Sequence, residues 1–511
     1  MKRVFLGWDE PFLNRAAAWL LERHNEISTM VVVVPTAQSG RRLRETLAEK
    51  SGALLSPKIV TPSFFLKSRD GESAADWIER LAWSEVLEDV KDWSEYEALF
   101  PQSPSTGANW SDNLALEFVK LRHSLQENGL LLTTAARKLN VPTEAERWES
   151  LARLENLVEQ KLQIWGLKSR SGILADGLFI SNKTSKIVLA GVVEVPPLVE
   201  RALLACENPV VVLIGAPEHN SGEFSAIGRP LPSWTKRSLS QPNGSIQVAA
   251  DPRQQATEAL RWISEKETSS DQVALGSADG DVGDELARTF SHAGWPTFHP
   301  ATINSAGGLT HWFKIWSAWL ADPKIATLAD LLTLPETGTL VANQLAQKAK
   351  RLAELRDRWM IAQVEDLQRK IDADDLPKSQ DKESAQEVLR AANSLLDWRN
   401  NTLNGDFFSV VQRLLATLGR SGPKTEEESN NMSIWLDEAA GMMSRVKRGP
   451  KFWIDLMLSE LPSPAPLPPE GRVLDVQGWL ELFYEPGQHL VLCGMNDGKV
   501  PARSGGEPWL S

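Results

Sequence analysis

Cysteine and histidine are scarce in this chain. Its 511 residues include two cysteines, Cys206 and Cys493, and seven scattered histidines. Two thiols alone can build neither a disulfide framework nor a four-thiolate cluster, and such low usage is typical of a reducing compartment. No histidine belongs to an H-E-x-x-H motif or lies at ligand spacing from another donor. We therefore expect neither a disulfide nor a metal site.

Long apolar runs are also missing. No stretch approaches the roughly 18 consecutive apolar residues that a membrane span requires. The chain begins with MKR, and the apolar run that follows stops at Gly7, which is too short for the core of a signal peptide. We therefore expect a cytoplasmic protein without membrane contacts.

Positive charge is in the minority. The chain has 55 Lys and Arg against 67 Asp and Glu, which gives a net charge of −12. A protein that coats DNA is usually basic, so a nucleic-acid contact here would need a local basic groove. Tyrosine is rare, with 2 Tyr against 20 Trp. Most of the tryptophans occupy apolar positions of helical segments, which favours core packing; base stacking by a few is the alternative.

The motifs of common enzymes are absent. No G-x-S-x-G elbow occurs. Residues 494–500 read GMNDGKV, which imitates a phosphate loop but is one residue short and lacks the hydroxyl that binds Mg²⁺. The single E-x-K, at residues 159–161, falls in a predicted helix, whereas a PD-(D/E)XK nuclease needs it on a strand. We therefore predict no catalytic residue and no cofactor in this sequence.

The sequence does contain short apolar strands that alternate with helices. Residues 30–34 read MVVVV and are followed by Pro35, a pattern typical of a buried parallel strand. Similar runs lie at residues 4–7, 58–62, 187–191 and 210–215, and helices are predicted at residues 14–22 and 40–49. This alternation predicts the fold class α/β with a doubly wound parallel sheet.

A second α/β unit follows the first, and a long helical segment interrupts each. Its strands are predicted at residues 246–249, 272–276, 472–476 and 489–493, with helices at 253–265 and 283–293. The predicted domains are a first lobe at 1–70 and 180–245 with a helical insertion at 71–179, and a second lobe at 246–308 and 471–511 with a helical insertion at 309–470.

The junction between the first strand and its helix has no phosphate loop. In a nucleotide-binding α/β protein, a G-x-x-x-x-G-K-[ST] loop at this place directs backbone N–H groups and a lysine at the phosphates. Residues 7–12 read GWDEPF instead. The loop has one glycine, no lysine and two carboxylates that would repel a polyphosphate. This junction is therefore not expected to bind ATP.

Five stretches, taken in order, carry a family resemblance. Residues 492–502 read LCGMNDGKVPA, which is similar to the G-x-N-[ED]-G-x-x-P-A strand and turn of the AddB family. The other stretches are residues 31–36 with 41–44, residues 59–65, residues 188–197, and residues 274–279 with 286 and 293–296. Together they resemble the helicase-like half of AddB, a subunit of the AddAB helicase–nuclease, and more distantly the UvrD-type superfamily-one helicases.

The resemblance implies two RecA-like lobes, each with a large helical insertion, in an inactivated superfamily-one helicase architecture. The fourth strand ends at Gly191 without the acidic residues that hold Mg²⁺ in an active helicase. In these helicases the next strand leads into a G-D-x-x-Q motif, and here Ala216 and His219 replace its Asp and Gln. Ala278 lies about where an Arg would touch the γ-phosphate. The chain stops at Ser511, about where the AddB nuclease domain with its iron–sulfur cluster would begin.

The resemblance also suggests DNA contacts. Three arginines open the helix after the second strand, three residues belong to a turn that lies near single-stranded DNA in the family, and three form the densest basic cluster of the chain. These candidates are Arg41, Arg42 and Arg44; Thr61, Ser63 and Phe64; and Arg445, Lys447 and Arg448. The structural alternatives are a solvated helix face for the arginines, core packing for Phe64, and a loop or helix end for the basic cluster.

The leading hypothesis is an ATP-independent, helicase-like scaffold of a bacterial double-strand-break repair complex. By resemblance it would grip or scan a single DNA strand, and its partners would be single-stranded or double-stranded DNA ends. An AddA-type helicase–nuclease subunit would supply the motor. One alternative is a protein-docking module without a DNA role, which the net charge of −12 favours. Another is the front half of a PD-(D/E)XK nuclease whose catalytic domain lies beyond Ser511.

Overall fold

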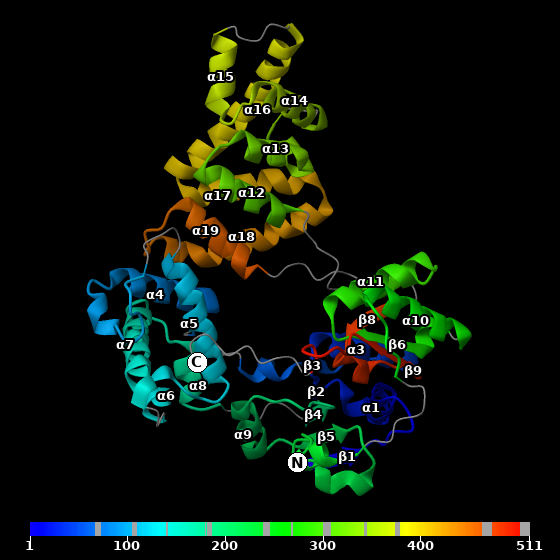
Figure 1. Ribbon diagram of the computed structural model, residues 1–511. Helices are drawn as coiled ribbons and strands as arrows, with labels where there is room; N and C mark the ends of the chain where they lie inside the picture. The colour runs from blue at the N-terminus through cyan, green and yellow to red at the C-terminus, as the bar shows by residue number, and fades with distance from the viewer. Residues whose placement is uncertain are drawn as a thin grey trace. The chain divides into compact units, whose positions relative to one another are not determined.

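A computed structural model describes residues 1–500 except 67–72, 105–109, 139–141, 179, 181–185, 239–245, 267–268, 300–307, 342–344, 374–378 and 462–472. The chain divides into two compact units. The first comprises Met1–Pro300 with Pro468–Ser511, and the second comprises Ala301–Leu467. The first unit holds two parallel sheets (Figure 1). The predicted α/β class is therefore confirmed.

The first sheet has five parallel strands in the order β1-β5-β4-β2-β3. Its strands are β1 (Lys2–Phe5), β2 (Met30–Val33), β3 (Lys58–Val60), β4 (Lys186–Ala190) and β5 (Val210–Ile214). The central strands β2, β4 and β5 are buried at almost every position. Their continuous apolar runs follow from this, because a parallel sheet in an α/β fold is covered on both faces.

Alternate residues of these strands serve two separate cores. Val32, Val188 and Val211 pack with α1 (Phe12–Leu21) and α3 (Ala37–Ser51) on one face. Their neighbours Val31 and Ile187 pack with α9 (Pro197–Ala205) on the other. The period of two along each strand thus divides the β-branched residues between the two faces.

Helix α3 begins at a strong local signal. The Thr36 hydroxyl accepts a hydrogen bond from the Ser39 backbone N–H at 3.1 Å, a cap that contributes about 1 kcal/mol. The helix ends at Gly52, whose φ of +68° is readily adopted by glycine. These two ends fix the position of the helix that carries Arg41, Arg42 and Arg44.

The segment between β3 and β4 is helical and has a core of its own. Its helices are α4 (Asp76–Asp89), α5 (Trp110–Gln126), α6 (Leu132–Lys138), α7 (Pro142–Ile164) and α8 (Arg170–Ala175). Trp83 and Phe118 lie at the centre of this core, with ring centroids 5.1 Å apart. The prediction that the tryptophans pack in the core is therefore confirmed for Trp83.

The second sheet has four parallel strands in the order β7-β8-β6-β9. They are β6 (Val273–Ser277), β7 (Thr297–Phe298), β8 (Leu474–Gly478) and β9 (His489–Cys493). Helices α10 (Pro252–Glu265) and α11 (Gly280–His292) pack on it. The short 3₁₀ helix η8 (Glu481–Tyr484) joins β8 to β9.

One predicted strand is wrong. Residues 246–249 are irregular rather than extended in a sheet. Ile246 is 69% and Val248 96% exposed. The alternation of apolar and polar residues is that of a half-buried strand, but no strand in the described part of the chain pairs with these residues, and tertiary context overrides the local pattern.

The described part of the second unit is helical (Figure 1). Its first helix carries three fully buried tryptophans, Trp312, Trp316 and Trp319, as predicted for tryptophans that pack in the core. Its helices are α12 (Leu309–Ala321), α13 (Ile325–Thr333), α14 (Leu345–Trp359), α15 (Val364–Asp372), α16 (Ser379–Asn404), α17 (Phe407–Leu418), α18 (Pro423–Met443) and α19 (Pro450–Glu460). Among the described residues of the whole chain, no helix is both long and apolar enough to cross a membrane.

Candidate functional site

The carboxyl edge of the first sheet is where a ligand would be expected, because ligands of open α/β sheets bind beyond the carboxyl ends of the strands. The loop after β1 lies there. Gly7 adopts φ +80°, and its N–H donates to the Ala216 carbonyl at 3.1 Å. The Trp8 indole N–H donates to the Gly215 carbonyl at 2.8 Å. Both bonds tie the loop to the segment that follows β5.

The two carboxylates of this loop face a helix arginine. Asp9 pairs with Arg15 of α1, and the Glu10 carboxylate lies 3.3 Å from the Arg15 guanidinium. Helix α1 has Pro11 at its N-cap position and no side-chain cap. The junction therefore presents acidic and apolar groups where a phosphate loop would present backbone N–H groups and a lysine.

Aromatic side chains fill the space above β4 and β5. Phe483 of η8 stacks on Phe12 with ring centroids 4.5 Å apart and an interplanar angle of 21°. The Tyr484 ring meets Phe12 edge-on at 5.5 Å, and its hydroxyl donates to the Ala190 carbonyl. A Cβ on Gly191, whose φ is +57°, would lie 2.8 Å from carbons of both phenylalanines. Glycine at this position thus permits the close approach of the rings.

We define the aromatic plug as Phe12, Phe483 and Tyr484. Phe12 and Tyr484 are buried, with 5% and 1% exposure, and Phe483 is 44% exposed. Burial raises the pKa of the Tyr484 hydroxyl well above its ordinary value, so it stays protonated and acts as a hydrogen-bond donor. The plug joins η8, beside the second sheet, to the edge of the first sheet.

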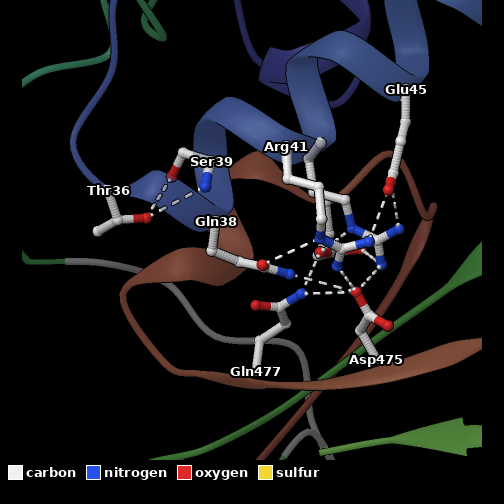
Figure 2. A network of polar contacts seen from close by, with 9 residues as sticks. Thr36, Gln38, Ser39, Arg41, Glu45, Asp475 and Gln477 are labelled. Atoms are coloured by element: carbon white, nitrogen blue, oxygen red, sulfur yellow. Dashed lines mark hydrogen bonds and ion pairs between the residues drawn. The ribbon is translucent and has the colours of Figure 1, made fainter. Parts of the chain in front are cut away.

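A cluster of charged side chains continues from the plug. The Arg42 guanidinium makes a bidentate contact with Glu485, at 2.8 Å and 2.9 Å, and also lies 3.0 Å from the Asp475 carboxylate. Arg41 pairs with the same Asp475 and with Glu45. Figure 2 shows Arg41 of α3 directed at Asp475 of β8, with Gln38 and Gln477 beside them.

We call this set the charge cluster: Gln38, Arg41, Arg42, Glu45, Asp475, Gln477 and Glu485. Two of its acids are deeply buried, with 3% exposure for Asp475 and 6% for Glu485. Gln477 donates to Asp475 at 3.2 Å and to Glu485 at 2.9 Å. Buried carboxylates thus receive both ionic and amide partners, as buried charges require.

Burial dominates the electrostatics of Glu485. It raises the carboxyl pKa from 4.5 to about 7, although the neighbouring Arg42 guanidinium acts to lower it. For Arg42, burial acts to lower the guanidinium pKa, but Glu485 and Asp475 outweigh it and raise the pKa above its ordinary value. Arg42 therefore stays charged at all relevant pH values, whereas Glu485 titrates near neutrality.

A cavity of 840 Å³ borders the charge cluster. Its polar lining carries more acidic than basic groups. The residues are Asn14, Arg41, Arg42, Glu45, Glu49, Ser270, Asp271, Gln272, Val273, Val473, Leu474, Asp475, Glu485, Pro486 and Gln488. Among the described residues, no three His, Cys, Asp or Glu side chains are grouped so that they could hold a metal ion.

The structure separates the predicted DNA-binding residues into distinct environments. Arg41 and Arg42 belong to the charge cluster, whereas Arg44 on the same helix is exposed. The Thr61 and Ser63 hydroxyls lie 3.0 Å apart at the end of β3, with Ser63 exposed.

Phe64, on the 3₁₀ helix Pro62–Leu66, packs against the first-sheet core, and the Lys58 ammonium lies 4.2 Å from its ring centroid. The basic cluster follows α18 in the second unit, where Arg445 and Lys447 are exposed and the Arg448 guanidinium lies 5.2 Å from the Phe452 ring centroid.

Sequence reasoning missed Asp475, Phe483, Tyr484 and Glu485. The signal for Asp475 was present, because residues 472–476 read RVLDV and place an acid inside an apolar strand. A buried acid needs a cationic partner, but the partner lies more than 430 residues away in the sequence, and periodicity cannot identify it.

The fold and this site define a parallel α/β protein with two sheets joined through an aromatic plug and a charge cluster. The chain matches no protein-family model and no curated protein sequence.

Proposed function

We propose that this chain is an ATP-independent, helicase-like scaffold of a bacterial recombination-repair complex of the AddAB type. In this proposal its two sheets are the RecA-like lobes of an inactivated superfamily-one helicase. The protein holds single-stranded DNA at a DNA end in the cytoplasm, and an AddA-type helicase–nuclease subunit supplies the motor. The chain itself performs no chemistry; its contribution is to position the strand.

The aromatic plug is the observation that carries this proposal. Phe12, Phe483 and Tyr484 occupy the carboxyl edge of the first sheet, which is the ligand-binding edge of this class of fold. A nucleotide bound there would have to displace these rings and break the hydrogen bond from Tyr484 to Ala190. Re-exposing one buried aromatic side chain costs about 2–3 kcal/mol, and the hydrogen bond adds about 1 kcal/mol.

The charges at the same edge also disfavour a nucleotide. Asp9 and Glu10 occupy the loop after β1, where a triphosphate would need cationic or N–H groups. The nearby cations are all paired: Arg15 with Asp9 and Glu10, Arg41 with Asp475, and Arg42 with Glu485. Binding of a polyphosphate would therefore require breaking the charge cluster as well as moving the plug.

DNA contact in this proposal starts from the accessible candidates. Arg44 and Ser63 are exposed in the first unit, and Arg445 and Lys447 in the second. Contacts of this kind bind phosphates without reading bases, so they suit a protein that holds any sequence. Arg41 and Arg42 could reach a phosphate only in competition with their carboxylate partners.

A protein-docking module without a DNA role is the second candidate. One observation favours it: two of the three arginines on α3 are neutralised inside the molecule, in a chain of net charge −12. This function would need no accessible basic groove. It predicts the same indifference to ATP but no affinity for DNA.

Two titrations of the purified chain separate these functions. Fluorescently labelled ATP with Mg²⁺ tests the nucleotide claim, and labelled oligo-dT at 50 mM and 200 mM salt tests the DNA claim. The scaffold proposal expects no saturable ATP binding and an oligo-dT affinity that falls with salt. Micromolar ATP binding would contradict it, and absence of DNA binding at both salt concentrations would leave the docking module.

A further inference from the structure

A single short segment of the second lobe reaches the first sheet through two kinds of contact. The segment runs from β8 through η8 to Glu485. Asp475 and Glu485, near its two ends, bind the arginines of α3. Phe483 and Tyr484 lie between them and bind the carboxyl edge of β4 and the side chain of Phe12.

The polar contact is specific in geometry. The Arg42 guanidinium faces Glu485 with two parallel hydrogen bonds of 2.8 Å and 2.9 Å, the arrangement in which an Arg–carboxylate pair is strongest. Asp475 and Glu45 are its other acidic neighbours, and Arg41 is the other cation facing Glu485. Removing one member would leave another buried and unpaired, which is costly.

The apolar contact depends on shape. The Phe483 ring stacks on Phe12 and lies over Gly191, where a Cβ would clash with both rings. The Tyr484 hydroxyl donates a hydrogen bond to the carbonyl of Ala190, and Ala190 is the last residue of β4. The strand end is therefore capped by a side chain of the other lobe.

We propose that residues 475–485 form an interlobe clasp that holds the two α/β lobes in one closed arrangement without any bound ligand. In a two-lobe protein that closes around a ligand, the ligand supplies the contacts that favour the closed state. Here the chain supplies them itself: stacked rings and a side-chain hydroxyl at one point, and an Arg–carboxylate pair at another. This inference is independent of whether the protein binds DNA.

The clasp is tested by measuring the distance between the lobes. Spin labels are attached to cysteines introduced at Lys50, at the end of α3, and Ser264, on α10; both positions are exposed. The native thiols are removed by the substitutions Cys206→Ser and Cys493→Ala. We expect one narrow distance distribution in the parent protein, unchanged by Mg²⁺–ATP.

Two variants attack the clasp at its two ends. Arg42→Met removes the cation and leaves Glu485 buried, and Phe483→Ala removes the stacked ring, which is itself partly exposed and so less critical for folding. Each should add a second, longer distance. Arg44→Met is the matched control, because Arg44 is an exposed arginine on the same helix, and it should keep the parent distribution.

Circular dichroism establishes that each variant is folded. If Arg42→Met does not fold, Phe483→Ala alone decides the question. A parent distribution that is already broad, or one that narrows when Mg²⁺–ATP is added, would overturn the clasp. So would a folded Phe483→Ala protein with the parent distribution.

Discussion

The pH dependence conferred by Glu485 is the most quantitative consequence of the charge cluster. Its carboxyl pKa is about 7 in the folded protein, raised from 4.5 by burial, with Arg42 opposing the shift. The folded state therefore binds a proton more tightly than the unfolded state does. Between these two pKa values, stability from this group decreases as pH rises, because the unfolded chain releases the proton first.

The magnitude follows from the two pKa values. Proton linkage with 4.5 and about 7 gives a loss on the order of 1 kcal/mol in the free energy of unfolding between pH 6 and pH 8 from this carboxyl alone. The substitution Glu485→Gln retains a side chain that accepts a hydrogen bond from Arg42 but cannot ionise. We therefore expect the difference in stability between parent and variant to change by about this amount across the interval.

Urea unfolding of both proteins at pH 6, 7 and 8 measures this difference. Taking the difference cancels the other groups that titrate in both proteins, including Glu79 and Glu155, whose pKa values burial also raises. Stability of the parent should fall relative to the variant as pH rises. If the difference in unfolding free energy between parent and variant is flat with pH, or moves in the opposite direction, the account is refuted. Burial would then not outweigh Arg42 in setting the pKa of Glu485.

Three further predictions concern other parts of the chain. Arg122 is 1% exposed and faces Glu79, Glu155 and Glu159, so Arg122→Met should destabilise the protein by about 3–5 kcal/mol, measured by urea unfolding. Lys120→Met, at an exposed pair on the same helix, should cost under about 1 kcal/mol. Burial raises the pKa of the Cys493 thiol to about 11; at pH 8 it should react with a disulfide reagent on the order of 100-fold more slowly than an unperturbed thiol, and an equal rate would contradict its burial. Arg44→Glu should weaken oligo-dT binding and make the slope of log affinity against log salt shallower by the amount of about one phosphate contact. An unchanged slope would show that Arg44 does not contact the DNA.

The sheets were largely predictable from the sequence, and the reason is physical. Residues 30–34 and 210–214 are apolar and mostly β-branched, a pattern typical of a strand covered on both faces, and they contain β2 and β5. Residues 246–249 carried a weaker signal and are irregular, because two apolar residues at alternate positions do not make a strand without a neighbour to pair with.

The site was predictable only in part. The absence of a phosphate loop after Gly7 follows directly from the sequence, but what replaces it does not. Phe483 and Glu485 lie in a short 3₁₀ helix and just after it, and neither has a periodic pattern. Their role depends on contacts with Phe12 and Arg42 across more than 400 residues, which local propensity and spacing cannot encode.

The central claim is that this protein holds DNA without using ATP. Fluorescence anisotropy of a labelled oligo-dT, titrated with the chain at 50 mM salt in the absence and presence of millimolar Mg²⁺–ATP, tests it most directly. The account predicts saturable binding with the same Kd in both conditions, since the aromatic plug and the charge cluster occupy the edge where ATP would act. A Kd that shifts several-fold on adding ATP, or no DNA binding in either condition, would contradict it.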